Sequence, residues 1–189
     1  MVLPAWRGLY GLTALLLIHP TPANPAGTWP AAADESDVAK VIAKFKQKDP
    51  GMTAVFAKAY GYAVFPTVGK GGIGIGGARG KGYVYQRGRL IGRSTLTQVT
   101  IGFQLGGQAY SEIVFFNTSA ALENFKSGRL KLDAQASAVA LTARAAADLA
   151  YRDGVAIVTM AKGGLMYEAS VGGQKFSFRP VVAAGSARH

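Results

Sequence analysis

The sequence predicts a single α+β domain with an antiparallel sheet that curls toward a barrel or a sandwich. We expect an N-terminal amphipathic helix and one or two further helices beside this sheet. Near the N-terminus, apolar residues recur with a helical period, and from residue 61 onward the period changes to two. Short strand-like runs are separated by turn residues about every 8–12 positions, and no linker divides them. The chain of 189 residues is long enough to bury one hydrophobic core.

The clearest helix is predicted over residues 36–48. Its apolar stripe follows the spacing i, i+3, i+4 and i+7 and consists of Val38, Val41, Ile42 and Phe45. Ser36 is expected to cap its start, and Pro50 and Gly51 interrupt the pattern after it. A second helical stretch is predicted from Thr53 to Ala59, and a short helix from Thr118 to Lys126.

Alternation with a period of two predicts the strands. The run Glu112–Phe116 is apolar on both faces and is therefore expected at the centre of the sheet. Pro66 is expected to end the first strand, and Arg87 and Gly88 to begin a turn. The other predicted strand segments are residues 62–65, 73–76, 83–86, 99–106, 130–136, 155–161, 165–171 and 175–178. The alanine-rich segment 138–150 is compatible with either a helix or a strand.

Residues 1–33 are interpreted as a cleaved signal peptide. Arg7 supplies a positive n-region, Leu12–Ile18 forms a short apolar core, and Ala31–Ala33 offers a cleavage site. The apolar run is shorter than the ~20 residues that a membrane span needs. The alternative is a tail rich in Pro and Ala. The predicted organisation is therefore a signal peptide at 1–33, a domain at 34–180 and a disordered tail at 181–189, in a periplasmic or secreted protein.

The formal net charge of +11 attracts the chain to polyanions such as an anionic membrane. No Asp or Glu occurs from Pro50 to Ser111, so bases at the turns of this span are expected to form a positive patch. Each base near an anionic leaflet contributes about 1 kcal/mol. The alternative is a dispersed, solvated surface. The candidate lipid-binding residues are Lys40, Lys44 and Lys48 in the first helix and Lys70, Arg79, Lys81, Arg87, Arg89 and Arg93 in the later span.

The glycine-rich stretch Gly69–Gly82 contains a formal dinucleotide-binding fingerprint, Gly72-x-Gly74-x-x-Gly77. That fingerprint requires a helix directly after it and an acidic residue about 20 positions on. Here the alternation is strand-like and the acid is missing, so nucleotide binding is not expected. Two interpretations remain open. Glycine on one strand face permits tight packing, or the stretch is an exposed loop that contacts lipid head groups.

Catalytic and metal sites find little support in the composition. The chain has no cysteine, and His189 is the single histidine after residue 33. The common nucleophile–base pairs and His or Cys metal sites are therefore absent. We expect a protein that is not an enzyme and that holds no metal and no cofactor. Nucleic acid is not expected as a partner.

Three segments together resemble the SYLF (Ysc84-type, DUF500) lipid-binding domain. They are GYAVFPTVGKGGIGIGGARGKGYVY from Gly61, SEIVFFNTSAALENF followed by LDAQASA from Ser111, and KGGLMYEASVGGQKFSF from Lys162. The resemblance covers about residues 35–180. It implies binding of anionic lipids, which are phosphoinositides in eukaryotic members, and actin binding in yeast-type members.

In some members of this family an N-terminal amphipathic helix contributes to lipid binding, and the resemblance implies this role for residues 36–48 here. Binding of anionic phospholipid without catalysis is therefore the expected function. A protein-interaction scaffold with an actin-like or envelope partner and a carrier of an acyl chain inside the barrel remain as alternatives.

Overall fold

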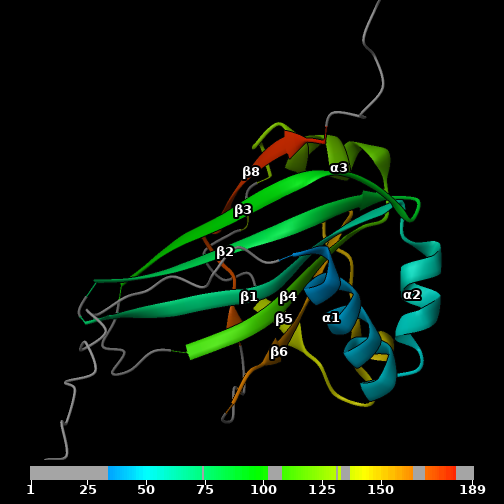
Figure 1. Ribbon diagram of the computed structural model, residues 1–189, viewed down its shortest axis with the longest axis horizontal. Helices are drawn as coiled ribbons and strands as arrows, with labels where there is room; N and C mark the ends of the chain where they lie inside the picture. Colours follow the sequence, from blue (N-terminus) through cyan, green and yellow to red (C-terminus); the bar gives the residue numbers. More distant parts are fainter. Residues whose placement is uncertain are drawn as a thin grey trace, which may run out of the picture.

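The computed structural model describes residues 34–73, 75–101, 108–130, 132, 137–163 and 169–181 (Figure 1). The predicted signal peptide at 1–33 and residues 182–189 of the predicted tail lie outside this part of the chain. The helices are α1 (Glu35–Lys48), α2 (Met52–Lys58), α3 (Ser119–Lys126) and α4 (Ala145–Asp148). The strands are β1 (Gly61–Ile73), β2 (Ile75–Gln86), β3 (Arg89–Ile101), β4 (Gln108–Phe116), β5 (Ser137–Ala140), β6 (Val155–Ala161), β7 (Ala169–Ser170) and β8 (Lys175–Pro180).

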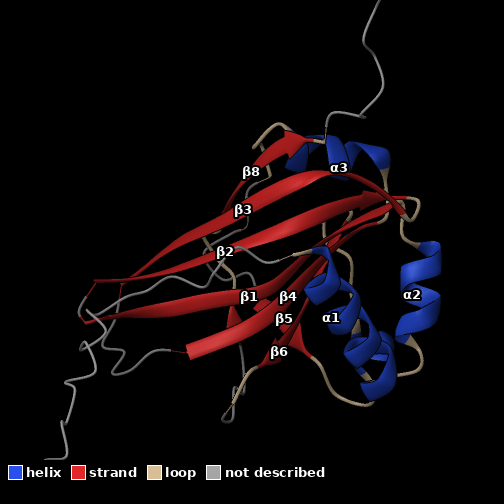
Figure 2. Cartoon of the chain, in the orientation of Figure 1, coloured by secondary structure: helices blue, strands red, loops and turns tan. Residues whose placement is uncertain are grey.

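The described strands form one open, mixed sheet in the order β7-β5-β6-β4-β1-β2-β3-β8, so the fold class is α+β (Figure 2). The prediction of a purely antiparallel sheet is wrong because β5 and β6 are parallel, with Val139 opposite Val158. The predicted closure toward a barrel or sandwich is not formed by the described strands, whose order ends at β7 and β8. A parallel pair requires a crossover connection, and residues 141–154, which contain α4, supply it. The alanine-rich segment 138–150 is thus part strand and part helix.

Helices cover both faces of the sheet, and the two faces carry separate hydrophobic clusters. We call the side on which α1, α2 and α4 pack the α1 face, and the opposite side the α3 face. On the α1 face, Val38, Val41 and Phe45 of α1 are buried in a cluster with strand residues such as Tyr62, Ile113 and Phe115. On the α3 face, Leu122 and Phe125 of α3 pack in a cluster with Phe65, Phe116 and Phe176.

β4 lies between β1 and β6 and is buried from Tyr110 to Phe116, which confirms the prediction of a central strand there. The prediction that Pro66 ends the first strand is wrong, because β1 continues to Ile73. Pro66 lies at a β-bulge, where the register of β1 shifts against both β2 and β4. A bulge tolerates proline because its missing N–H removes no regular ladder bond. The Pro66 carbonyl accepts a hydrogen bond of 2.8 Å from Ser111 Oγ.

Helix ends are held by side-chain caps. Asp34, rather than the predicted Ser36, caps α1, because its carboxylate accepts hydrogen bonds from Ser36 Oγ at 2.6 Å and from Asp37 N at 2.9 Å. At the other end of α1, the Asp49 carboxylate accepts from Gly51 N at 2.9 Å and from Ala146 N at 2.7 Å. Asp49 therefore ties the end of α1 to α4. Thr118, the predicted first residue of the third helix, is its N-cap, and its Oγ1 accepts a hydrogen bond of 3.1 Å from Ala121 N.

The glycine-rich span forms the long β1–β2 hairpin, and its glycines permit close packing on the α3 face. A Cβ added at Gly80 would lie 2.8 Å from Val68 Cγ2. One added at Gly82 would lie 2.7 Å from Phe65 Cδ1 and would collide with the Val64 carbonyl oxygen. The tight-packing interpretation therefore accounts for both positions.

We expect Gly82→Ala to destabilise the protein by about 1–3 kcal/mol, because the added methyl group overpacks the α3 face. Gly71→Ala is the matched control, since a Cβ there meets no atom within 4 Å. Urea denaturation followed by circular dichroism measures both. Equal midpoints for the two variants would contradict the packing argument.

Candidate functional site

The nine predicted lipid-binding residues reach the surface, but they do not form one patch. All are exposed except Lys70, which is half-buried. Six of them lie on α1 or on the α1 face of β2 and β3, namely Lys40, Lys44, Lys48, Arg79, Lys81 and Arg93. The remaining three lie elsewhere, as described below.

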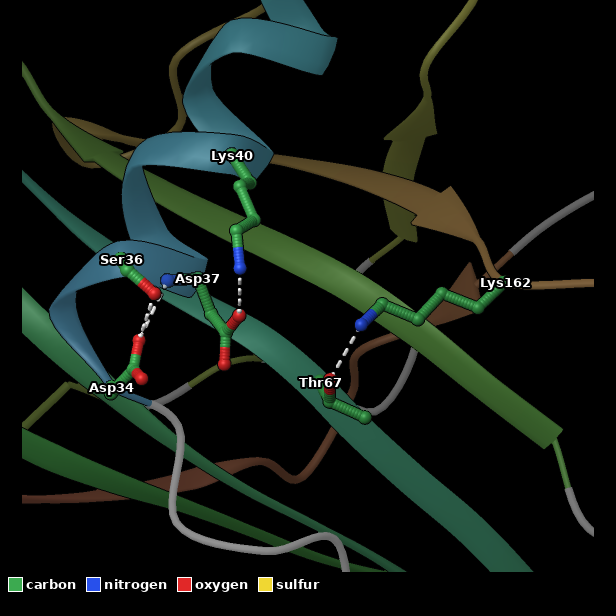
Figure 3. A network of polar contacts seen from close by, with 6 residues as sticks. All are labelled: Asp34, Ser36, Asp37, Lys40, Thr67 and Lys162. Atoms are coloured by element: carbon green, nitrogen blue, oxygen red, sulfur yellow. Dashed lines mark hydrogen bonds and ion pairs between the residues drawn. The ribbon is translucent and has the colours of Figure 1, made fainter.

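The α1 lysines adjoin a further base that the sequence did not single out for binding. Lys40 pairs with Asp37 at 3.2 Å, with both side chains largely in solvent. Lys162, just after β6, donates a hydrogen bond of 2.5 Å to Thr67 Oγ1 on β1 (Figure 3). Partial burial, and then the neighbouring charge of Lys44, lower the pKa of Lys162. Lys44 and Lys162 therefore bring positive charge from α1 and from β6 into one region.

Arg79, Lys81 and Arg93 share the α1 face because of strand alternation and register. On β2, Arg79 and Lys81 alternate with the buried Ala78, whose side chain belongs to the cluster on the α3 face. Arg93 on β3 lies opposite Tyr83, and its guanidinium carbon is 5.4 Å from the centre of the Tyr83 ring. This distance fits a cation–π contact that orients Arg93.

Strand β8 adds two bases that the sequence analysis missed as site residues. β8 pairs with β3, which places Lys175 opposite Thr97 and Arg179 opposite Arg93. The sequence does indicate that these two bases share one face of a strand, because Lys175, Ser177 and Arg179 alternate with two phenylalanines. The sequence could not predict that β8 pairs with β3, because the paired residues are 78 or more positions apart in the chain.

Together, β2, β3 and β8 display nine positions on the α1 face, which we call the grid. Its rows are Tyr83–Arg93–Arg179, Lys81–Thr95–Ser177 and Arg79–Thr97–Lys175. Directly opposite residues on paired strands point to the same side of the sheet. Of these nine residues, Tyr83 alone is buried, and none is acidic. The grid is therefore a continuous polar surface with five bases.

The grid and the α1 lysines meet at Thr67. This residue lies opposite Lys81 on β2 and accepts the hydrogen bond of Lys162. A row of polar residues thus runs from Thr67 on β1 across β2 and β3 to β8, and Lys162, which follows β6, joins it by reaching over the intervening β4. The acids at α1 lie at its two ends: Glu35 and Asp37 in its first turn, and Asp49 directly after Lys48.

Arg87, Arg89 and Lys70 lie apart from this surface. Arg87 lies in the predicted turn between β2 and β3, with a φ of 48° and its guanidinium carbon 5.3 Å from the centre of the Tyr60 ring, and Arg89 begins β3. Lys70 pairs with Ala78 and so occupies a register position that belongs to the α3 face. The expectation of one patch from Lys70 to Arg93 is therefore wrong in its geometry.

A second polar group lies inside the α3 face. Glu112 has no exposed surface and accepts a hydrogen bond of 2.9 Å from Gln174 Nε2, while its Oε1 has no partner among the described residues. Burial raises the pKa of Glu112 to about 7. Burial, and then the nearby Glu112, also raise the pKa of Tyr110. The predicted central strand begins at Glu112, but its partner Gln174 lies 62 residues away in the sequence and could not be predicted from local patterns.

No three His, Cys, Asp or Glu side chains in the described part of the chain come together in a way that would hold a metal ion. None of its helices has both the length and the apolar character needed to span a membrane.

Comparison with known proteins identifies the family. Residues 97–183 match the family model Ysc84, described as "Las17-binding protein actin regulator". This match covers 87 of the 189 residues and supports the SYLF (Ysc84-type) family that the sequence motifs predicted. A search of curated proteins found no match.

The buried Glu112 predicts a pH-dependent stability. Its folded pKa of about 7 exceeds the ordinary value of 4.5, so folding favours the protonated form. The stabilisation is complete below pH 4.5 and is lost as the pH rises to 7 and above. We expect Glu112→Gln, which mimics the neutral acid, to match the parent near pH 4.5. At pH 8 the variant should be more stable by roughly 3 kcal/mol.

Thermal and urea unfolding at both pH values measure this difference. Glu123→Gln is the control, because Glu123 is an exposed carboxylate paired with Lys126. A stability difference between Glu112→Gln and the parent that stays constant with pH would contradict the prediction.

Proposed function

We propose that the chain binds the surface of an anionic membrane through its α1 face and catalyses no reaction. The observation that carries this proposal is the gathering of exposed bases on the grid without an interleaved acid. Several bases that contribute about 1 kcal/mol each give substantial, salt-sensitive binding. Arginine suits the phosphate of a lipid head group because its planar fork donates two parallel hydrogen bonds.

The rest of the chain supports a binding role in the cell envelope. The described residues contain no histidine or cysteine, so they offer no common nucleophile–base pair. Residues 1–33 have the composition of a signal peptide, which would deliver the domain to the periplasm or the exterior. An acyl-chain carrier would need a barrel interior, and the open sheet offers none among the described strands, so we do not propose that function.

A protein partner is the second candidate. It is favoured by the family description, which names an actin regulator that binds Las17. The same basic surface would suit an acidic protein. Affinity capture that returns a stoichiometric protein partner, combined with no binding to anionic vesicles, would favour this candidate.

Vesicle co-sedimentation tests the lead proposal. We expect the protein to sediment with phosphatidylglycerol vesicles and not with phosphatidylcholine vesicles, and to be released as salt is raised. Equal binding to both vesicle types at low salt would exclude the electrostatic mechanism.

The helix contribution has a separate test. Changing Lys40, Lys44 and Lys48 together to Glu should leave the fold intact, because exposed charges add little stability. It should weaken binding to phosphatidylglycerol vesicles, most clearly at low salt. The matched control reverses the same number of charges at Arg87, Arg129 and Arg152, exposed positions that belong neither to the helices of the α1 face nor to the grid. If the helix variant binds as well as this control, α1 has a structural role only.

A further inference from the structure

The cross-strand pair of Arg93 and Arg179 has no stabilising role that the fold explains. The two residues lie directly opposite each other on β3 and β8, and both are exposed. Like charges in this arrangement destabilise a sheet. None of the other positions of the grid is an acid that would neutralise them. An anion held between the two guanidinium groups would remove this repulsion.

Protection of the sheet edge explains only part of the pattern. β8 ends the sheet, and charged side chains on an edge strand prevent pairing with other chains. That reason applies to Lys175 and Arg179. It does not apply to Arg79, Lys81 and Arg93, because β2 and β3 are paired on both sides.

The surroundings of the pair suit a phosphate group. Arg93 is oriented by its contact with the buried Tyr83 ring, so less side-chain freedom is lost when it binds. The next row supplies the Thr95 and Ser177 hydroxyl groups beside the Lys81 ammonium group. The row after that repeats two bases, Arg79 and Lys175, on either side of Thr97.

An exposed apolar residue continues the same face. Val99 follows Thr97 in the alternation of β3, and 75% of it is exposed, which makes it the most exposed large hydrophobic residue of the described chain. A valine beside a cluster of bases is poorly placed in water. It is well placed where phosphates border the apolar part of a bilayer. Bases followed by an exposed apolar side chain favour a membrane over a small soluble anion.

We propose that the grid is the face that meets the bilayer, with Arg93 and Arg179 together holding one lipid phosphate and Val99 entering the interface. This inference rests on the proposed function and gives it a defined site and orientation. The protein then lies with β2, β3 and β8 against the membrane, as the uncovered stretch of these strands in Figure 1 allows.

The decisive variant is Arg179→Glu, because it separates binding from stability. It turns the like-charged pair with Arg93 into an opposite-charged pair, so the free energy of unfolding should stay equal or rise. Binding to vesicles of phosphatidylcholine mixed with phosphatidylglycerol should fall by about tenfold or more, since a favourable base becomes a repelled acid. Arg129→Glu makes the same change in net charge at an exposed position after α3 and should bind within about twofold of the parent.

A fluorescent probe tests the orientation independently. The chain has no cysteine, so a single cysteine can carry a polarity-sensitive dye. The dye at Val99→Cys should shift to the blue when these vesicles are added. The dye at Asn124→Cys, an exposed position on α3, should not shift.

The outcomes separate this inference from the proposed function. If the parent does not bind the anionic vesicles, the proposed function fails. If the parent binds and Arg179→Glu binds equally well, or Arg129→Glu weakens binding as much, the grid is not the docking face. A blue shift at position 124 with none at position 99 would overturn the orientation.

Discussion

The rest of the structure depends on the burial of the central strands on both faces. β4 and the first half of β1 lie between two hydrophobic clusters, one closed by α1, α2 and α4 and the other by α3. A strand that is covered on both faces favours apolar side chains, as in the run from Ile113 to Phe116. The buried polar residues of the same strand, Ser111 and Glu112, each have a hydrogen-bond partner. On β2, β3 and β8, the buried residues Ala78, Leu96 and Phe176 belong to the cluster on the α3 face. Their other face meets water, and this is where the bases of the grid lie.

The bulge at Pro66 connects these two environments. Phe65 and Val68 both belong to the cluster on the α3 face, although their spacing is odd for a regular strand. The extra residue leaves Thr67 on the opposite side, across from Lys81 and within reach of Lys162. One irregular backbone step thus keeps the core continuous and also joins the basic region near α1 to the grid. Strand propensity suggested that Pro66 ends a strand. In the structure, Pro66 instead lies at the bulge that shifts the register of β1.

Local sequence patterns predicted the helices, but they could not predict which distant strands pair with each other. Each of the helices α1, α2 and α3 has a helical pattern of apolar residues within a single segment of the sequence. The predicted helix boundaries agree with the structure within about one residue. The parallel pairing of β5 with β6 and the place of β8 beside β3 depend on contacts across the chain, which no single window contains. The same distinction applies to the bases of the grid. Arg79, Lys81 and Arg93 were found because the span around them lacks acids, whereas Lys175 and Arg179 join them only through the register of β8.

The attachment of α1 to the rest of the fold affects the kinetics with which the protein would associate with a membrane surface. Val38, Val41 and Phe45 are buried, and Asp49 holds the end of the helix to α4. The lysines of α1 are exposed while the helix remains in place, so contact with an anionic surface requires no prior opening of the fold. If the protein binds membranes as proposed, association is a single bimolecular step whose rate grows linearly with lipid concentration and is accelerated by electrostatic attraction at low salt. A protein that first had to release its helix would instead reach a rate plateau set by that release.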